Sequence, residues 1–120
     1  MAEYRIGEIE MQFAKIIWEH EPIKSGELAK LSETKLHWKK STTYTVLKRL
    51  CDKGIFQNMK GIVTSLISYE QFQGKQSEQF VEETFKGSLP SFVAAFCSQK
   101  KLSKAEIEEL RKIIEESEVE

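Results

Sequence analysis

The stretch STTYTVLKRL, from Ser41 to Leu50, and the residues that follow it constrain the fold most. Its Thr, Tyr and Val residues favour a strand by propensity alone. With the alternating period of a strand, however, both faces would carry a mixture of apolar and polar side chains. A helical period gathers Thr43, Val46, Leu47 and Leu50 on one side. The stretch is therefore predicted to be a helix with those four residues facing inward.

A hairpin is predicted directly after this helix. Gly54 is expected to end the helix. Two β-prone runs follow, over residues 55–59 and 62–69, and Lys60-Gly61 separates them as in a hairpin turn.

Two helices are predicted before this helix. Apolar residues at helical spacing indicate the first over residues 7–20, with Gly7 at the cap position and Glu10 three residues later. The second is expected over residues 25–35, with Ser25 as its cap. Three helices followed by a hairpin is the order of a winged helix-turn-helix domain.

The rest of the chain is predicted to be helical. One helix is expected from Ser77, a second from a Ser88 cap with Pro90 in its first turn, and a last one from a Ser103–Glu106 capping box. The predicted fold class is mainly α with a small β-hairpin wing. A winged helix-turn-helix domain over residues 1–70 is followed by a helical dimerisation region over residues 71–120.

The sequence does not favour an enzyme, a metal site or a membrane protein. Cys51 and Cys97 lack the spacing of a zinc site or of a disulfide framework, and no catalytic motif is present. No cofactor is expected. No segment approaches the roughly 18 to 20 apolar residues of a membrane span, and the first residues show no hydrophobic signal segment. The protein is therefore expected in the cytoplasm, with no membrane partner.

Positive charge is concentrated in the middle of the chain. The net charge of −1 divides into −3 over residues 1–34, +6 over residues 35–69 and −4 over residues 70–120. A basic block between acidic flanks is typical of a surface that binds a polyanion, although a run of charge also occurs as a plain solvated surface.

The polar side of the predicted helix at 41–52 suits the major groove of DNA. Short side chains let a helix approach base edges, and cations further out bind phosphates. The alternative is that the Ser and Thr residues are only helix caps and surface positions. The candidate DNA-binding residues are Lys39, Lys40, Ser41, Thr42, Tyr44, Thr45, Lys48, Arg49 and Lys60.

The helices after residue 70 carry many apolar residues for their length. A symmetric dimer would bury these apolar residues. It would also place its two DNA-reading helices one on each half of a palindromic site. Alternatively, the same residues pack back onto the winged helix. The candidate dimerisation residues are Phe80, Val81, Phe85, Phe92, Phe96, Ile107, Leu110 and Ile114.

Several segments, in order along nearly the whole chain, resemble the penicillinase-repressor family, which has copper-responsive repressors among its relatives. These segments are IGEIEMQFAKIIW, Trp38 followed by TTYTVLKRLCDKG, FKG at 85–87, SFVAAF, and LSKAEIEELRKII.

The resemblance implies a homodimeric DNA-binding transcriptional repressor with no enzymatic activity. Its palindromic operator would contain TACA and TGTA elements in front of β-lactamase, resistance or metal-homeostasis genes. The family's DNA contacts fall on Ser41, Thr42, Tyr44, Thr45 and Arg49. Family members often carry Ser-Pro where this chain has Lys39-Lys40, and often a basic residue where it has Tyr44, so the base preference stays open.

The resemblance also implies a mode of regulation. Penicillinase repressors are inactivated by cleavage of an Asn–Phe bond, which maps onto Ala95–Phe96 and would require a sensor-activated protease. The paired Cys-x-Cys of the copper-responsive relatives is absent from the C-terminal segment, which argues against metal sensing by that route.

The alternative function, from another class of protein, is that of a winged-helix adaptor. Its basic face would bind an acidic protein instead of DNA.

Overall fold

The structure is a computed structural model that describes residues 4–119. The described chain forms two compact units, residues 4–79 and residues 80–119. The two units divide within one continuous helix, between residues 79 and 80.

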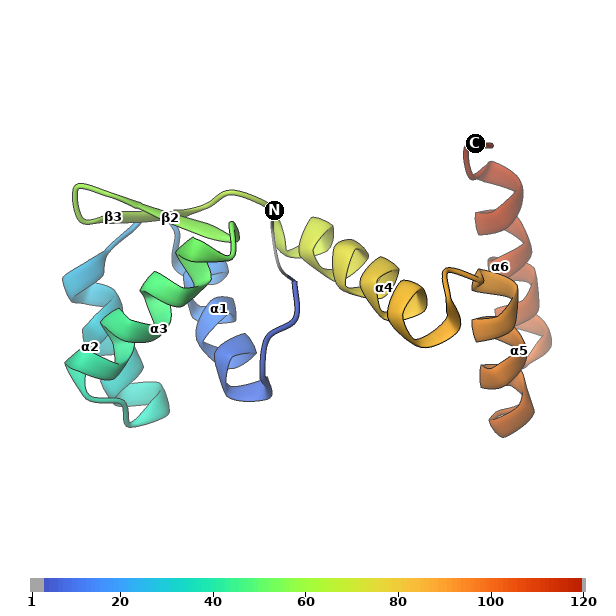
Figure 1. Cartoon of the computed structure of the whole chain (residues 1–120), viewed down its shortest axis with the longest axis horizontal. Coiled ribbons are helices and arrows are strands. Elements are labelled where there is room, and N and C mark those ends of the chain that lie inside the picture. Colours follow the sequence, from blue (N-terminus) through green and yellow to red (C-terminus); the bar gives the residue numbers. More distant parts are fainter. Residues whose placement is uncertain (1–3, 120) are drawn as a thin grey trace. The chain divides into compact units, whose positions relative to one another are not determined.

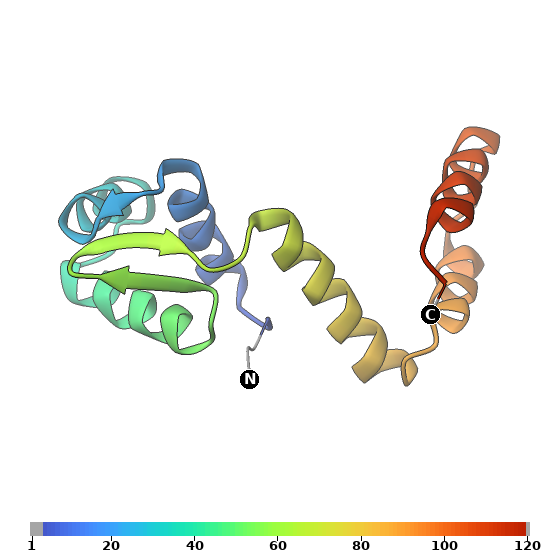
Figure 2. The same cartoon turned by 90° about the horizontal axis from the view of Figure 1, so that it is seen from above.

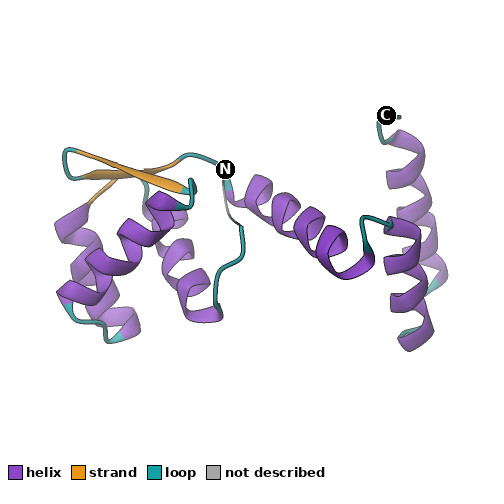
Figure 3. Ribbon diagram, in the orientation of Figure 1, coloured by secondary structure: helices purple, strands orange, loops and turns teal. Residues whose placement is uncertain are grey.

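The first unit contains three helices, three strands and most of a fourth helix (Figure 1). A three-stranded antiparallel sheet lies along one side of the three helices (Figure 3). The elements are α1 (Glu8–His20), β1 (Ile23–Lys24), α2 (Ser25–Leu36), α3 (Lys40–Asp52), β2 (Phe56–Met59), β3 (Ile62–Ser65) and α4 (Tyr69–Phe85).

The core of this unit takes side chains from every one of these helices and strands. The predicted inward face of α3 is confirmed, because Thr43, Val46, Leu47 and Leu50 are all buried. Largest among the other fully buried side chains are Phe13, Ile17, Leu28, Ile55, Phe56, Val63 and Phe72. Burial of these side chains positions α3 with its opposite side toward solvent.

The first two predicted helices are confirmed as α1 and α2, with one correction at a cap. The Glu10 carboxylate accepts the Gly7 N–H at 3.2 Å, as the predicted cap requires. Ser25 is not a cap, because α2 has Lys24 at its N-cap and Ser25 as its first residue. The Ser25 N–H instead donates to the Gly61 carbonyl at 2.8 Å, which joins the start of α2 to the hairpin turn.

The predicted hairpin is confirmed, and we call it the wing (β2 and β3, residues 56–65). It turns at Lys60 and Gly61, whose φ angles of 54° and 86° are those of a tight hairpin turn. The short strand β1 was not predicted. It pairs Ile23 with Val63 and Lys24 with Ile62, so the sheet order is β1-β3-β2.

The predicted start of the fourth helix was wrong. The second β-prone run was expected to reach Tyr69 and the helix to begin at Ser77, whereas β3 ends at Ser65 and α4 begins at Tyr69. Ser68 caps α4, because its hydroxyl accepts the Gln71 N–H at 3.1 Å and the Gln71 side chain accepts the Ser68 N–H at 2.9 Å.

The second unit contains the end of α4 together with α5 (Leu89–Gln99) and α6 (Lys104–Glu116), which lie side by side (Figure 2). Both predicted caps are confirmed. The Ser88 hydroxyl accepts the Ser91 N–H, and Ser103 and Glu106 form a reciprocal capping box. Gly87, at φ 80°, makes the turn between α4 and α5, a conformation that residues with a Cβ rarely adopt.

Candidate nucleic-acid interface

The solvent-facing side of α3 carries short polar side chains in its first half. Ser41, Thr42 and Thr45 are exposed, and Tyr44 is half-buried at one flank. The Thr45 hydroxyl donates to the Ser41 carbonyl at 2.9 Å. Since its proton is engaged within the helix, Thr45 offers a ligand only oxygen lone pairs and a methyl group.

Two lysines stand at the start of α3. Lys39 is the N-cap in an extended conformation, and no side chain caps the first turn. The Lys40 ammonium lies 5.9 Å from the centre of the Tyr44 ring, a cation–π distance. The N-terminus of α3 therefore combines uncapped N–H groups with two cations, which favours an anion there.

The two cations further along α3 both have carboxylate neighbours. The Lys48 ammonium lies 3.2 Å from the Asp52 carboxylate, and both side chains are largely exposed. The Arg49 guanidinium lies 3.3 Å from the Glu10 carboxylate of α1. The α3 surface is therefore less strongly positive than its lysines and arginine alone suggest.

Lys60 is the one candidate that lies away from α3. It occupies the turn of the wing, where the Asn58 side chain accepts the Gly61 N–H at 3.0 Å. The bond from Ser25 to Gly61 places this turn beside the start of α2. The structure thus brings the other eight candidates together on α3 and its cap, and puts Lys60 on a separate element.

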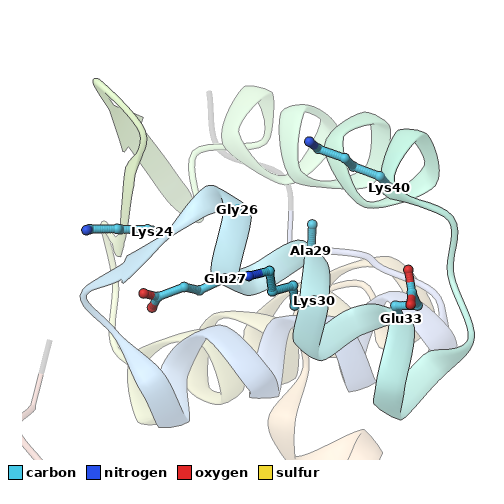
Figure 4. Close-up of a pocket in the computed structure, with 7 residues that line it drawn as sticks. All are labelled: Lys24, Gly26, Glu27, Ala29, Lys30, Glu33 and Lys40. Atoms are coloured by element: carbon cyan, nitrogen blue, oxygen red, sulfur yellow. The ribbon is translucent and has the colours of Figure 1, made fainter.

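A groove of about 420 Å³ lies between α2 and the start of α3 (Figure 4). Figure 4 shows Lys40 extending from α3 above Ala29 of α2. The groove is lined by Lys24, Gly26, Glu27, Ala29, Lys30, Glu33 and Lys40. Lys24 and Lys30 are cations near α3 that the sequence did not single out. Lys24 reaches the groove because β1 pairs with β3, and Lys30 reaches it because α2 packs on α3.

The candidate dimerisation residues lie on an unusually apolar surface. None of the described residues from 80 to 119 is buried, and the exposed fractions of Phe96 and Ile114 are 48% and 67%. Phe80, Phe85 and Phe92 meet edge to face with ring centres 5.5 to 6.0 Å apart. These rings form a small aromatic cluster at the junction of α4 and α5.

Between α5 and α6 runs an apolar groove of about 350 Å³. It is lined by Phe92, Val93, Phe96, Cys97, Leu102, Glu106, Glu109, Leu110 and Ile113. Three of the predicted residues therefore line one groove: Phe92, Phe96 and Leu110. The remaining candidates on α6, Ile107 and Ile114, are exposed on the same helix.

The surroundings of Cys51 make its thiol less acidic, and no metal-binding cluster is found in the part of the chain that the structure describes. Burial, and after it the Asp52 carboxylate, raises the pKa of the Cys51 thiol, while Lys48 lowers it to a smaller extent. Over residues 4–119, no three His, Cys, Asp or Glu side chains gather as they would around a metal ion. Within the same range, no helix is both long and apolar enough to cross a membrane.

Three helices, a hairpin, and a third helix that presents short polar and basic side chains to solvent define a winged helix-turn-helix protein. The profile of the family described as "Penicillinase repressor" matches residues 6–116. The chain belongs to this family of transcriptional repressors.

Two similar proteins illustrate the relationship. The penicillinase repressor of Bacillus licheniformis is 33% identical over 117 residues, which cover 93% of this chain and 91% of that protein. The methicillin resistance regulatory protein MecI of Staphylococcus aureus (strain Mu50 / ATCC 700699) is 30% identical over 115 residues, or 92% of this chain and 94% of that protein. Both alignments span nearly the full length of each protein, so they include the winged helix and the helices that follow it.

Proposed function

We propose that the protein is a homodimeric transcriptional repressor that binds a palindromic operator through α3. The observation that carries this proposal is the surface of α3, where short hydroxyl side chains occupy the exposed first half and cations stand at both ends. A helix with this arrangement fits the major groove with its backbone close to the base edges.

The residues of this surface divide by the kind of contact they suit. Ser41, Thr42 and Thr45 are short enough to meet base edges. Tyr44, at the flank of α3, suits a phosphate or a base. The cations suit the phosphate backbone, which carries no base information: Lys39, Lys40, Lys48, Arg49 and Lys60.

In this proposal, the second unit forms the dimer interface. Its exposed phenylalanine, leucine and isoleucine side chains are poorly placed in water, and a two-fold partner that presents the same surface would bury them. Two copies of α3 would then read two half-sites one or two DNA turns apart. We propose the division predicted from the sequence: residues 1–70 would bind DNA, and residues 71–120, which include the second unit, would form the dimer.

The relatives suggest the kind of operator and gene. They are named for penicillinase and for methicillin resistance. We infer an operator of the TACA/TGTA type in front of β-lactamase, resistance or metal-homeostasis genes. The protein would act in the cytoplasm, where that DNA is accessible.

The bond between Ala95 and Phe96 is the proposed inactivation site for a sensor-activated protease. Both residues are exposed on α5, and Phe96 lines the apolar groove. A cut there would separate Phe92 from Phe96 and Leu110, which line the same groove. The proposal is that this cut weakens the dimer and thereby releases the operator.

The dependence of DNA affinity on salt tests the proposal. Each phosphate contact contributes a slope of about −0.9 to a plot of log affinity against log salt concentration. With several cations per protomer, the dimer should show a slope steeper than about −5 on a TACA/TGTA palindrome by fluorescence anisotropy. A protein that binds no duplex at any salt concentration would contradict the proposal and favour the adaptor function.

A further inference from the structure

The Glu10 carboxylate makes two contacts that connect the start of α1 with α3. One oxygen accepts the Gly7 N–H at 3.2 Å, and the other lies 3.3 Å from a terminal nitrogen of Arg49. Glu10 and Arg49 are 39 residues apart in sequence. Glu10 is therefore both a helix cap and the ion-pair partner of a candidate DNA-binding residue.

The two side chains of this pair differ in exposure. The Glu10 side chain is 20% exposed, whereas the Arg49 side chain is 51% exposed. Both oxygens of Glu10 therefore have a partner within the protein. Arg49 has five N–H donors, and a single contact leaves others available toward solvent.

A second bond holds the same two segments together. The Lys53 ammonium, at the C-cap of α3, donates to the Arg5 carbonyl at 2.7 Å. The end of α3 is thus joined to the first turn of α1 through Arg49 and to the chain just before α1 through Lys53. The first turn of α1, which carries Glu10, therefore lies beside the end of α3.

We propose that Glu10 is a positioning residue that competes with DNA phosphates for Arg49. This inference rests on the proposed function, because it requires α3 to meet DNA. A phosphate that approaches Arg49 also approaches the Glu10 carboxylate, and two anions on one guanidinium repel each other. Glu10 therefore lowers the affinity for DNA of any sequence.

Replacing Glu10 by Gln isolates this effect. The Gln side chain can still accept the Gly7 N–H, since Gln also serves in a capping box, but it carries no charge. The matched control is Glu8→Gln, which removes the same charge from the same first turn of α1 at an exposed position. The full-length protein is used throughout.

The affinity of each variant is measured on the palindrome and on random duplex at fixed salt. Glu10→Gln should bind both DNAs about two- to thirty-fold more tightly, the range that corresponds to the loss of two exposed ion pairs, one in each protomer of the dimer. Glu8→Gln should change the affinity by less. In an Arg49→Ala background, Glu10→Gln should have no effect, because the residue through which it acts is gone.

Three results would overturn the proposal. Unchanged or weaker binding by Glu10→Gln would mean that Glu10 does not compete for Arg49. Equal tightening in the Arg49→Ala background would mean that Glu10 repels DNA directly. An equal gain in DNA affinity from Glu8→Gln would mean that the effect comes only from the change in net charge. If the wild-type protein binds no DNA, the proposed function itself fails, which is a separate outcome.

Discussion

At the scale of single residues, the internal hydrogen bond of Thr45 limits how it can recognise a base. Its hydroxyl proton is engaged by the Ser41 carbonyl, so the oxygen can only accept. The methyl group remains for contact with a thymine methyl, and the proposed TACA/TGTA operator contains thymines. We therefore expect Thr45 to discriminate mainly through its methyl group.

Three substitutions of Thr45 test this expectation. Thr45→Ala should relax discrimination between palindrome and random DNA by ~1 to 3 kcal/mol. Thr45→Ser keeps the hydroxyl and should lose about 1 kcal/mol of this discrimination, because the methyl group is missing. Thr45→Val keeps a methyl group in the same place and should lose less discrimination than either of the other two variants. Competition titrations measure all three, and a loss for Val as large as for Ala would assign the recognition to the oxygen instead.

At the scale of elements, the wing is held to the end of α1 by one carboxylate. Glu21, at the C-cap of α1, accepts the Ser65 N–H at 2.8 Å and the Ser65 hydroxyl at 2.8 and 2.9 Å. The two residues are partly buried, and hydrogen bonds to a charged group are the stronger kind. Glu21 therefore fixes the last residue of β3 against the helix that precedes β1.

Removing this carboxylate should destabilise the first unit. Glu21→Ala leaves the Ser65 N–H and hydroxyl without their acceptor, which should lower the free energy of unfolding by about 1 to 3 kcal/mol. Glu19→Ala, which removes an exposed carboxylate two positions away, is the control and should change it by less than about 0.5 kcal/mol. Urea unfolding followed by tryptophan fluorescence measures both. Equal effects of the two substitutions would show that the Glu21 bonds contribute little.

The elements also show what the sequence could reveal and why. The period of α3 identified its inner face correctly, because burial imposes the 100° spacing on the residues themselves. The turn at Lys60 and Gly61 was visible because hairpin turns need residues that tolerate positive φ. Local chemistry of this kind can be read from a single sequence.

Features made by distant parts of the chain could not be read in that way. β1 is two residues long, too short for any periodic pattern, and exists only through pairing with β3. The Arg49–Glu10 pair likewise joins residues on separate helices. The start of α4 is a different kind of error, since Ser68 and Gln71 form a capping box that was present in the sequence but was masked by the β-prone run before it.

At the scale of the whole molecule, the second unit offers far more apolar surface than buried core. The groove between α5 and α6 and the stripe of α6 are exposed. Exposed apolar surfaces of this size are typical of sites where proteins associate. The proposed homodimer accounts for it and links it to DNA binding, since two recognition helices on a palindrome bind together.

Charged substitutions in the groove test the dimer. Phe92→Glu and Leu110→Glu should each produce monomers by sedimentation, because a carboxylate buried in an apolar interface is strongly unfavourable. Operator binding should weaken at the same time. Leu66→Glu places the same charge on an exposed leucine of the first unit and should leave the dimer intact. An unchanged dimer in both groove variants would exclude this surface as the interface.

The central claim, that α3 reads a DNA sequence, is tested most directly by competition. A labelled TACA/TGTA palindrome bound to the wild-type protein is displaced by unlabelled palindrome or by a scrambled duplex of the same composition, at one physiological salt concentration. The account predicts that the palindrome competes at least about 10³-fold more effectively, the lower end of specific recognition. Equal competition by the two duplexes would contradict it.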